Sequence, residues 1–225
     1  MSQNTSHAVM SQRTEAKHSL DNFPTPPWAT RALIEHVIGA GSVKGKSCLE
    51  PACGSGHMAA PLSEYFGAVH GSDIYDYGYG DVCDFLTYPY EANDYDWVIT
   101  NPPFRSAEEF TQRALTIAKD GVAILARTLF IESVGRYQKL FKETPPTIFA
   151  QFTERVPMVK GRLDRKASTA TGYAWLVWQK SALKAGSRLN WIPPCRKDLE
   201  RDRDYSDPIT IRADYTSQAR LLAAE

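Results

Sequence analysis

SCLEPACGSG, residues 47–56, is the stretch that decides the fold. A short apolar run at its start is typical of a β-strand, and it feeds a turn of small residues that precedes a helical pattern from Met58 to Phe66. In an open α/β sheet, ligands bind beyond the carboxyl ends of the strands. Small residues at Ala52, Gly54 and Gly56 let a ligand approach the backbone closely. We expect a ligand-binding turn, with a glycine turn that binds nothing as the alternative; no Gly-Lys-Ser/Thr follows, so a phosphate loop is excluded.

Strand and helix patterns alternate outward from this turn. Further strands are expected at 68–72, 97–100, 121–126, 147–152 and 173–178, and helices at 28–38, 107–118 and 133–141. This alternation predicts an α/β fold, with a mostly parallel sheet of about seven strands and helices on both faces. No long helix separates the last two strands, which are expected to form an antiparallel hairpin at one edge. Thr25 is expected to cap the first helix, because prolines follow it.

The two ends of the chain differ from its middle. Residues 1–22 are polar and lack an apolar period, which predicts a flexible N-terminal arm. Residues 23–182 carry the strand and helix patterns of one folded domain. Residues 183–225 are polar and rich in both signs of charge, which predicts a C-terminal extension.

Composition narrows the class of protein. The chain has 225 residues, a formal net charge of zero and 43% apolar residues, which suits one globular domain and argues against a protein that coats nucleic acid non-specifically. The four cysteines form no C-x2-C pair, so neither a metal site nor a disulfide framework is expected. The sequence shows neither a membrane-spanning run nor a hydrophobic signal core, which favours a cytoplasmic protein without a membrane partner.

Acidic residues follow the next two strand signals. Asp73 ends the second expected strand, where a carboxylate can accept hydrogen bonds from both hydroxyls of a ribose. Asp84 could bind an adenine amino group, with Phe85 packed on the ring face. The alternatives are a solvated loop aspartate at 73, and a capping aspartate beside a buried phenylalanine at 84 and 85.

Asn101-Pro102-Pro103-Phe104 follows an apolar strand and carries the strongest chemical signal. Two prolines fix the backbone and remove N–H donors, which leaves the Asn101 side-chain oxygen and the Pro102 carbonyl as acceptors at one point. An amino group conjugated to a ring is a poor nucleophile because its lone pair is delocalised. Two acceptors that hold its hydrogens favour a localised lone pair, and so stabilise the transition state of methyl transfer more than the ground state. Phe104 offers a face to the substrate ring.

With these motifs in order, the sequence resembles the class I S-adenosylmethionine-dependent methyltransferases, and most closely the small phage or prophage type that methylates N6 of adenine in DNA. The resemblance implies a Rossmann-like fold and S-adenosylmethionine as cofactor. It also implies that the cofactor is bound by Thr25, Glu50, Pro51, Ala52, Cys53, Gly54, Gly56, Asp73, Asp84 and Phe85. Asn101, Pro102, Pro103 and Phe104 match the catalytic tetrapeptide. No large recognition domain follows, which departs from many members.

Adenine within a duplex must be flipped out of the stack before it can react, so the protein must bind the flanking phosphates. The densest basic segment is expected to do this, through Arg155, Lys160, Arg162, Arg165 and Lys166. A solvated surface loop is the alternative.

Several other functions remain open. The same chemistry would serve an adenine of rRNA or tRNA, or a protein glutamine amide, since each presents a planar conjugated nitrogen. A non-catalytic cofactor-binding module is a further alternative, although the intact tetrapeptide speaks against it. A dinucleotide-dependent dehydrogenase ranks last, because the glycine turn is too short for G-x-G-x-x-G.

Overall fold

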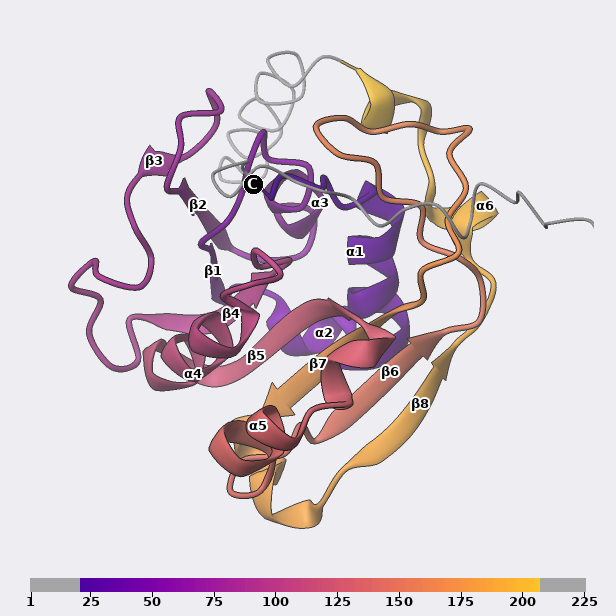
Figure 1. Ribbon diagram of the computed structural model, residues 1–225. Helices are drawn as coiled ribbons and strands as arrows, with labels where there is room; N and C mark the ends of the chain where they lie inside the picture. Colours follow the sequence, from indigo (N-terminus) through magenta and orange to yellow (C-terminus); the bar gives the residue numbers. More distant parts are fainter. Residues whose placement is uncertain (1–20, 207–225) are drawn as a thin grey trace, which may run out of the picture.

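The structure is a computed structural model that describes residues 21–206 (Figure 1). The expected N-terminal arm, residues 1–22, lies outside the described residues except for Asp21 and Asn22. Residues 207–225 of the expected C-terminal extension also lie outside them.

One eight-stranded sheet runs through the molecule in the order β3-β2-β1-β4-β5-β7-β6-β8. All neighbouring pairs are parallel except those that β7 makes with β5 and β6, which are antiparallel. The fold class expected from the sequence is therefore confirmed. The strands are β1 Ser47–Glu50, β2 Ala68–Asp73, β3 Asp81–Val82, β4 Tyr95–Thr100, β5 Ala118–Arg127, β6 Ile148–Phe152, β7 Tyr173–Gln179 and β8 Arg188–Ile192.

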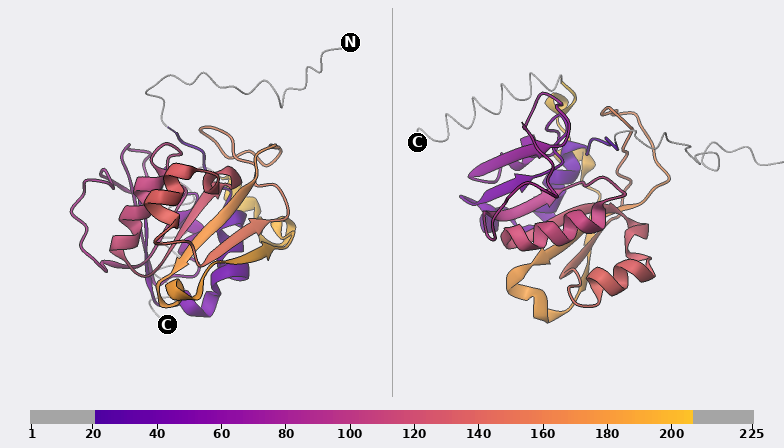
Figure 2. Two further views of the ribbon diagram at one scale, coloured as in Figure 1. Left: turned by 60° about the horizontal axis from the view of Figure 1, so that its bottom comes forward. Right: turned by 60° about the vertical axis from the view of Figure 1, so that its left-hand side comes forward.

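Helical segments cover both faces of this sheet (Figures 1 and 2). They are α1 Pro27–Leu33, η1 Ile34–Ile38, α2 Ala40–Val43, α3 Ala59–Leu62, α4 Ala107–Ile117, η2 Thr128–Ile131, α5 Val134–Arg136, η3 Tyr137–Phe141, η4 Lys180–Ala185, α6 Arg196–Leu199 and η5 Asp202–Tyr205. Each described helix is too short or too polar to cross a bilayer.

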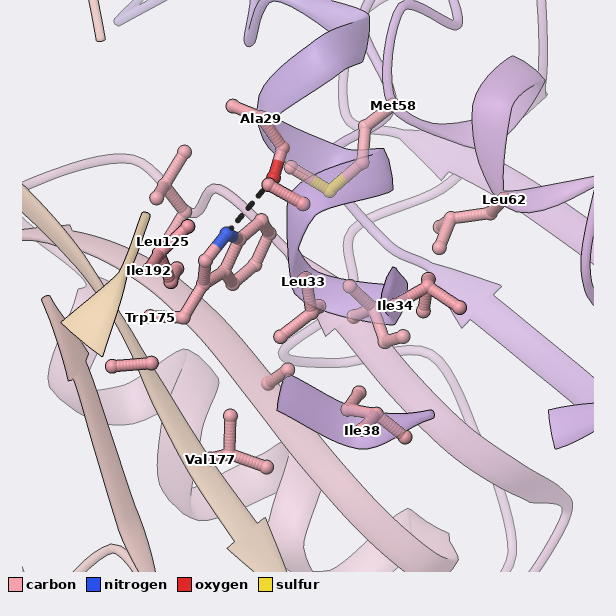
Figure 3. Packing of buried hydrophobic residues seen from close by; sticks show 14 of the residues in the cluster. Ala29, Leu33, Ile34, Ile38, Met58, Leu62, Leu125, Trp175, Val177 and Ile192 are labelled. Carbon is pink, nitrogen blue, oxygen red and sulfur yellow. Dashed lines mark hydrogen bonds between the residues drawn. The ribbon is translucent and has the colours of Figure 1, made fainter. Parts of the chain in front are cut away.

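Two buried clusters form the core, one on each face of the sheet. Side chains alternate along β7, so that Trp175 joins the cluster under α1 while Leu176 and Trp178 join the cluster under α4. The Trp175 indole nitrogen donates to the carbonyl of Ala29 at 3.1 Å, which satisfies its polar atom inside the core (Figure 3). Burial on both faces explains why the central strands are continuous apolar runs.

Three local features differ from the sequence expectation. Thr25 does not cap α1, because Pro26 occupies the cap position and no side chain bonds to the helix start. Only Ala59–Leu62 of the expected helix 58–66 is regular α-helix. The β6–β7 pair is antiparallel as expected, but it does not end the sheet, since β8 lies beyond β6.

The first part of the expected C-terminal extension belongs to the folded domain. Strand β8 pairs with β6, and the chain then returns to α1. There Asp204 forms an ion pair at 2.8 Å with Arg31, whose side chain is fully buried and also pairs with Glu64 at 2.9 Å. A fully buried guanidinium needs such partners, so these contacts anchor the segment after residue 183.

Candidate active site at the carboxyl ends of the strands

A cavity of about 760 Å³ opens where β1, β2, β4 and β5 end. Parallel strands bring their carboxyl ends to one edge of the sheet, and the order of strands reverses there, between β1 and β4. Of the residues expected from the sequence, the cavity is lined by Thr25, Glu50, Pro51, Ala52, Cys53, Gly54, Asp73, Asp84, Phe85, Asn101, Pro103 and Phe104. Gly56, Pro102 and the five basic residues of 155–166 are not among its lining residues.

The glycine turn is hydrogen-bonded to the end of β2. Gly54 has a φ of +49° and its N–H donates to the Asp73 carboxylate at 2.9 Å. The N–H of Cys53 donates to the carbonyl of Ser72, also at 2.9 Å. Two bonds between neighbouring strand ends therefore set the shape of this wall before any ligand enters.

Gly56 has a different reason to be glycine. Its φ is +86°, and a Cβ placed on it would lie 2.2 Å from the ring of Tyr79. The expected close approach of a ligand to this residue is replaced by a close approach of a tyrosine from the loop after β2. Gly56 thus allows the turn to pack against Tyr79, and it does not line the cavity.

Two acids lie on this wall. Glu50 is 2% exposed, and its Oε2 has no hydrogen-bond partner within the described part of the chain. Burial, with the nearby charge of Asp73, raises the pKa of the Glu50 carboxyl well above its usual range. Burial likewise raises the pKa of Asp73. A ligand that brings hydroxyl or ammonium donors would stabilise both carboxylates.

The remaining residues expected to bind the cofactor differ in whether their side chains already have partners. The Thr25 hydroxyl is buried at the cavity and has no partner among residues 21–206. Asp84 accepts from the N–H of Leu86 at 3.0 Å, as a turn-capping aspartate does. Phe85 is 1% exposed, with its ring centroid 4.9 Å from that of Phe110. The contacts of 84 and 85 thus match the structural alternative, although both residues reach the cavity.

Asn101 is oriented by contacts from distant parts of the chain. Its Nδ2 donates to the carbonyl of Phe23 at 2.9 Å and lies 3.6 Å from the sulfur of Met158. Its Oδ1 is buried without a partner in the described structure. Because the nitrogen is held, the acceptor oxygen is fixed at the end of β4, where a donor is missing.

Phe104 is held on several sides. Its N–H donates to the carboxylate of Asp21 at 2.7 Å, and its ring lies 5.3 Å from that of Phe23, tilted by 38°. The guanidinium of Arg127, at the end of β5, lies over the Phe104 ring at 3.9 Å from its centroid. The expected open face of this ring is therefore already covered.

The basic segment lies beside the site but is partly neutralised. Arg165 forms an ion pair with Asp202 at 2.7 Å, and Arg162 forms one with Asp164 at 3.2 Å. The middle of the segment reaches the site, where the N–H of Gly161 donates to the carbonyl of the cavity-lining residue Asn22 at 2.8 Å. Arg155 and Lys166 are exposed, and Lys160 is half-buried.

Sequence reasoning missed other residues that line the cavity. Ile74 and Tyr77 follow Asp73, and their place after the second strand was a usable signal. His57 lies just past the glycine turn, and burial lowers its pKa to about 4, so its ring is neutral at pH 7. Arg127 carried no motif. Among residues 21–206, no three His, Cys, Asp or Glu side chains gather into a metal site.

Comparisons with known proteins bear on the fold. No protein-family model and no curated protein matched the sequence. A proposed RNA methyltransferase from Pyrococcus horikoshii is 18% identical, with a TM-score of 0.54 over 74% of this chain and 90% of its own. The modification subunit of a proposed type I restriction enzyme from Vibrio vulnificus is 15% identical, with a TM-score of 0.55 over 88% of this chain and 53% of its own. The chain has the fold of these methyltransferases.

Proposed function

We propose that the protein transfers a methyl group from S-adenosylmethionine to the exocyclic N6 amino group of adenine in DNA. The observation that carries this proposal is the state of Asn101. Its amide nitrogen is held by a carbonyl and its oxygen is buried without a donor, at the end of a strand that borders the cavity. An amino group is the donor that would complete this arrangement.

The wall at β1 and β2 fits S-adenosylmethionine. Asp73 would accept from ribose hydroxyls, and Glu50 and Thr25 carry buried oxygens that the methionine end would satisfy. The cavity volume of about 760 Å³ is within the range of sites for ligands of this size. When bound, the cofactor supplies an electrophilic methyl group.

The wall at β4 activates the acceptor. The Asn101 oxygen would hold one hydrogen of an amino group, which helps to localise the nitrogen lone pair. The Pro102 carbonyl, expected from the sequence to hold the second hydrogen, is not among the lining residues of the cavity, so the substrate would have to reach past them to meet it. Removal of one preorganised hydrogen-bonding group from an active site, such as an oxyanion-hole donor, lowers the rate about 100-fold to 1,000-fold. The nitrogen lone pair of an adenine amino group is delocalised into the ring, so its reactivity increases when the lone pair is localised. An aliphatic amine needs no such activation, which favours a nucleobase as the substrate.

DNA is proposed as the carrier of that adenine because of the motifs around the site. Thr25 of the Thr-Pro segment, which resembles that of DNA methyltransferases, lines the cavity, and exposed arginines border the opening at 105 and 127. The target nucleotide would have to leave the stack to reach Asn101.

The test offers labelled S-adenosylmethionine to duplex DNA that lacks N6-methyladenine, to rRNA and to a protein extract in parallel. Asn101→Ala is compared with Asn190→Ala, a matched control, since the Asn190 amide also donates to a backbone carbonyl, that of His36 at 3.1 Å, on the distant strand β8. We expect label as N6-methyladenine in DNA, lost in Asn101→Ala and kept in Asn190→Ala.

Label in rRNA alone or in protein alone would retain the amino-methyl chemistry and overturn the DNA substrate. Absence of label from all three, with wild-type protein that binds S-adenosylhomocysteine, would identify a non-catalytic binding module instead.

A further inference from the structure

Arg127 occupies the place where a substrate ring is expected. It is the last residue of β5, it is exposed, and it lines the cavity. Its guanidinium lies 3.9 Å from the centroid of the Phe104 ring. Within residues 21–206 the structure gives this guanidinium neither a hydrogen bond nor an ion pair, so the ring face is its main contact.

A guanidinium and a nucleobase are both flat and stack on an aromatic face at similar distances. The two cannot occupy the same face of Phe104 at once. Phe104 itself is held by the bond to Asp21 and by the ring of Phe23, so it is not the group that moves aside. Entry of a base onto this face therefore requires Arg127 to leave it.

We propose that Arg127 covers Phe104 until the target base enters, and that it then binds the phosphate of the incoming nucleotide. This inference rests on the proposed function, since it takes a nucleotide as the ligand. Arginine is suited to the second state because its planar fork of donors matches two phosphate oxygens. A cation that exchanges a ring face for a phosphate keeps a favourable partner in both states.

Arg105 lines the cavity as well, whereas the arginines of the basic segment are less available for this contact. Arg162 and Arg165 of the basic segment are engaged in ion pairs with Asp164 and Asp202. Neither of them lines the cavity, whereas Arg127 does. The phosphate nearest the reacting base would thus meet Arg127 before it met the basic segment.

The residues that follow Arg127 also suit contact with unstacked nucleic acid. Leu129 is 64% exposed and Ile131 is 45% exposed, both on η2 directly after β5. Proteins that bind the minor groove combine cationic side chains with apolar side chains that unstack base steps. Residues 127–131 therefore expose a cation and two apolar side chains, and the cation, Arg127, is the one that lines the cavity.

The test measures methylation of unmethylated DNA by wild type, Arg127→Ala, Arg127→Lys and Arg188→Ala at several salt concentrations. Arg188 is an exposed arginine on the far edge strand and serves as the matched control. We expect Arg127→Ala to raise KM for DNA about tenfold and to reduce the slope of log(kcat/KM) against log salt by about one, as loss of one phosphate contact does. Its kcat should stay within about threefold, and Arg127→Lys should recover most of the KM.

A second measurement separates phosphate binding from ring support. With S-adenosylhomocysteine present, wild type should bind deoxyadenosine 5′-monophosphate more tightly than deoxyadenosine, and Arg127→Ala should lose this preference. An unchanged KM and salt slope in Arg127→Ala, or a lower kcat alone, would overturn the inference and leave the proposed function intact. If wild type methylates no DNA at all, the proposed function fails first.

Discussion

The two sides of the cavity are built in different ways. On the side of β1 and β2, the shape is set by contacts between consecutive strands, such as the bond from Gly54 to Asp73, 19 residues apart. On the side of β4, Asn101 is positioned by Phe23 and Met158, which are 78 and 57 residues away. The first side is therefore a local motif, and the second is a product of the tertiary fold.

This difference matters for function. A wall made by local bonds can be preformed for a cofactor that is common to many enzymes. A wall assembled from distant segments can change with the substrate, because it depends on tertiary contacts and not on a contiguous motif. We expect damage to the two walls to have separable consequences.

The largest expected effect concerns the β4 wall. Asn101→Ala should lower the single-turnover rate of methyl transfer about 100-fold to 1,000-fold, because the acceptor oxygen for the amino group is lost. Asn101→Asp should retain more activity than Asn101→Ala, since a carboxylate oxygen still accepts. Rapid-quench measurements with saturating cofactor test this; equal rates for Asn101→Ala and wild type would remove the residue from the chemistry.

Gly56→Ala should damage the β1 wall through folding. The new Cβ meets the Tyr79 ring at 2.2 Å in a backbone conformation with φ of +86°, so we expect a loss of about 2–4 kcal/mol in the free energy of unfolding. Gly45→Ala is the matched control, because its φ is +76° but no atom lies within 4 Å of its added Cβ. Urea denaturation should show the larger loss for Gly56→Ala, and equal losses would disprove the steric role of Tyr79.

His57 offers a smaller test of how far the β1 wall excludes water from a buried side chain. Its pKa in the folded protein is about 4, below the ordinary value of 6.5, so the unfolded chain binds the proton more readily. Stability should therefore fall as pH decreases from about 6.5 to about 4, by up to about 3 kcal/mol from this residue. Thermal unfolding of wild type against His57→Gln over this range checks it; parallel profiles would contradict the burial of His57.

The same contrast explains what the sequence could predict. The parallel sheet and the wall at β1 and β2 follow from contiguous patterns, so the glycine turn, Glu50 and Asp73 were all placed at the cavity in advance. Strand β8 was missed although Leu189 and Trp191 alternate with polar residues, because this signal is only five residues long and lies in a segment rich in charge. Both side chains are exposed, so the alternation does not mark a buried face. The place of β8 is decided by pairing with β6.

The sequence was least informative where a residue's partner comes from elsewhere in the chain. Gly56 fits the pattern of a ligand-facing glycine, yet Tyr79 fills the space beside it. Arg127 ends an apolar strand without any motif, and only the fold brings it to Phe104. Charge density in the basic segment could not reveal that Arg165 is already paired with Asp202.

The most direct test of the central claim is calorimetric titration of S-adenosylhomocysteine into wild type, Asp73→Ala and Asn101→Ala. If the β1–β2 wall binds the cofactor and the β4 wall acts on the substrate, Asp73→Ala should weaken binding about tenfold or more, through loss of hydrogen bonds to a charged acceptor. Asn101→Ala should bind within about twofold of wild type. Weakened binding in Asn101→Ala together with unchanged binding in Asp73→Ala would contradict the assignment of the two walls.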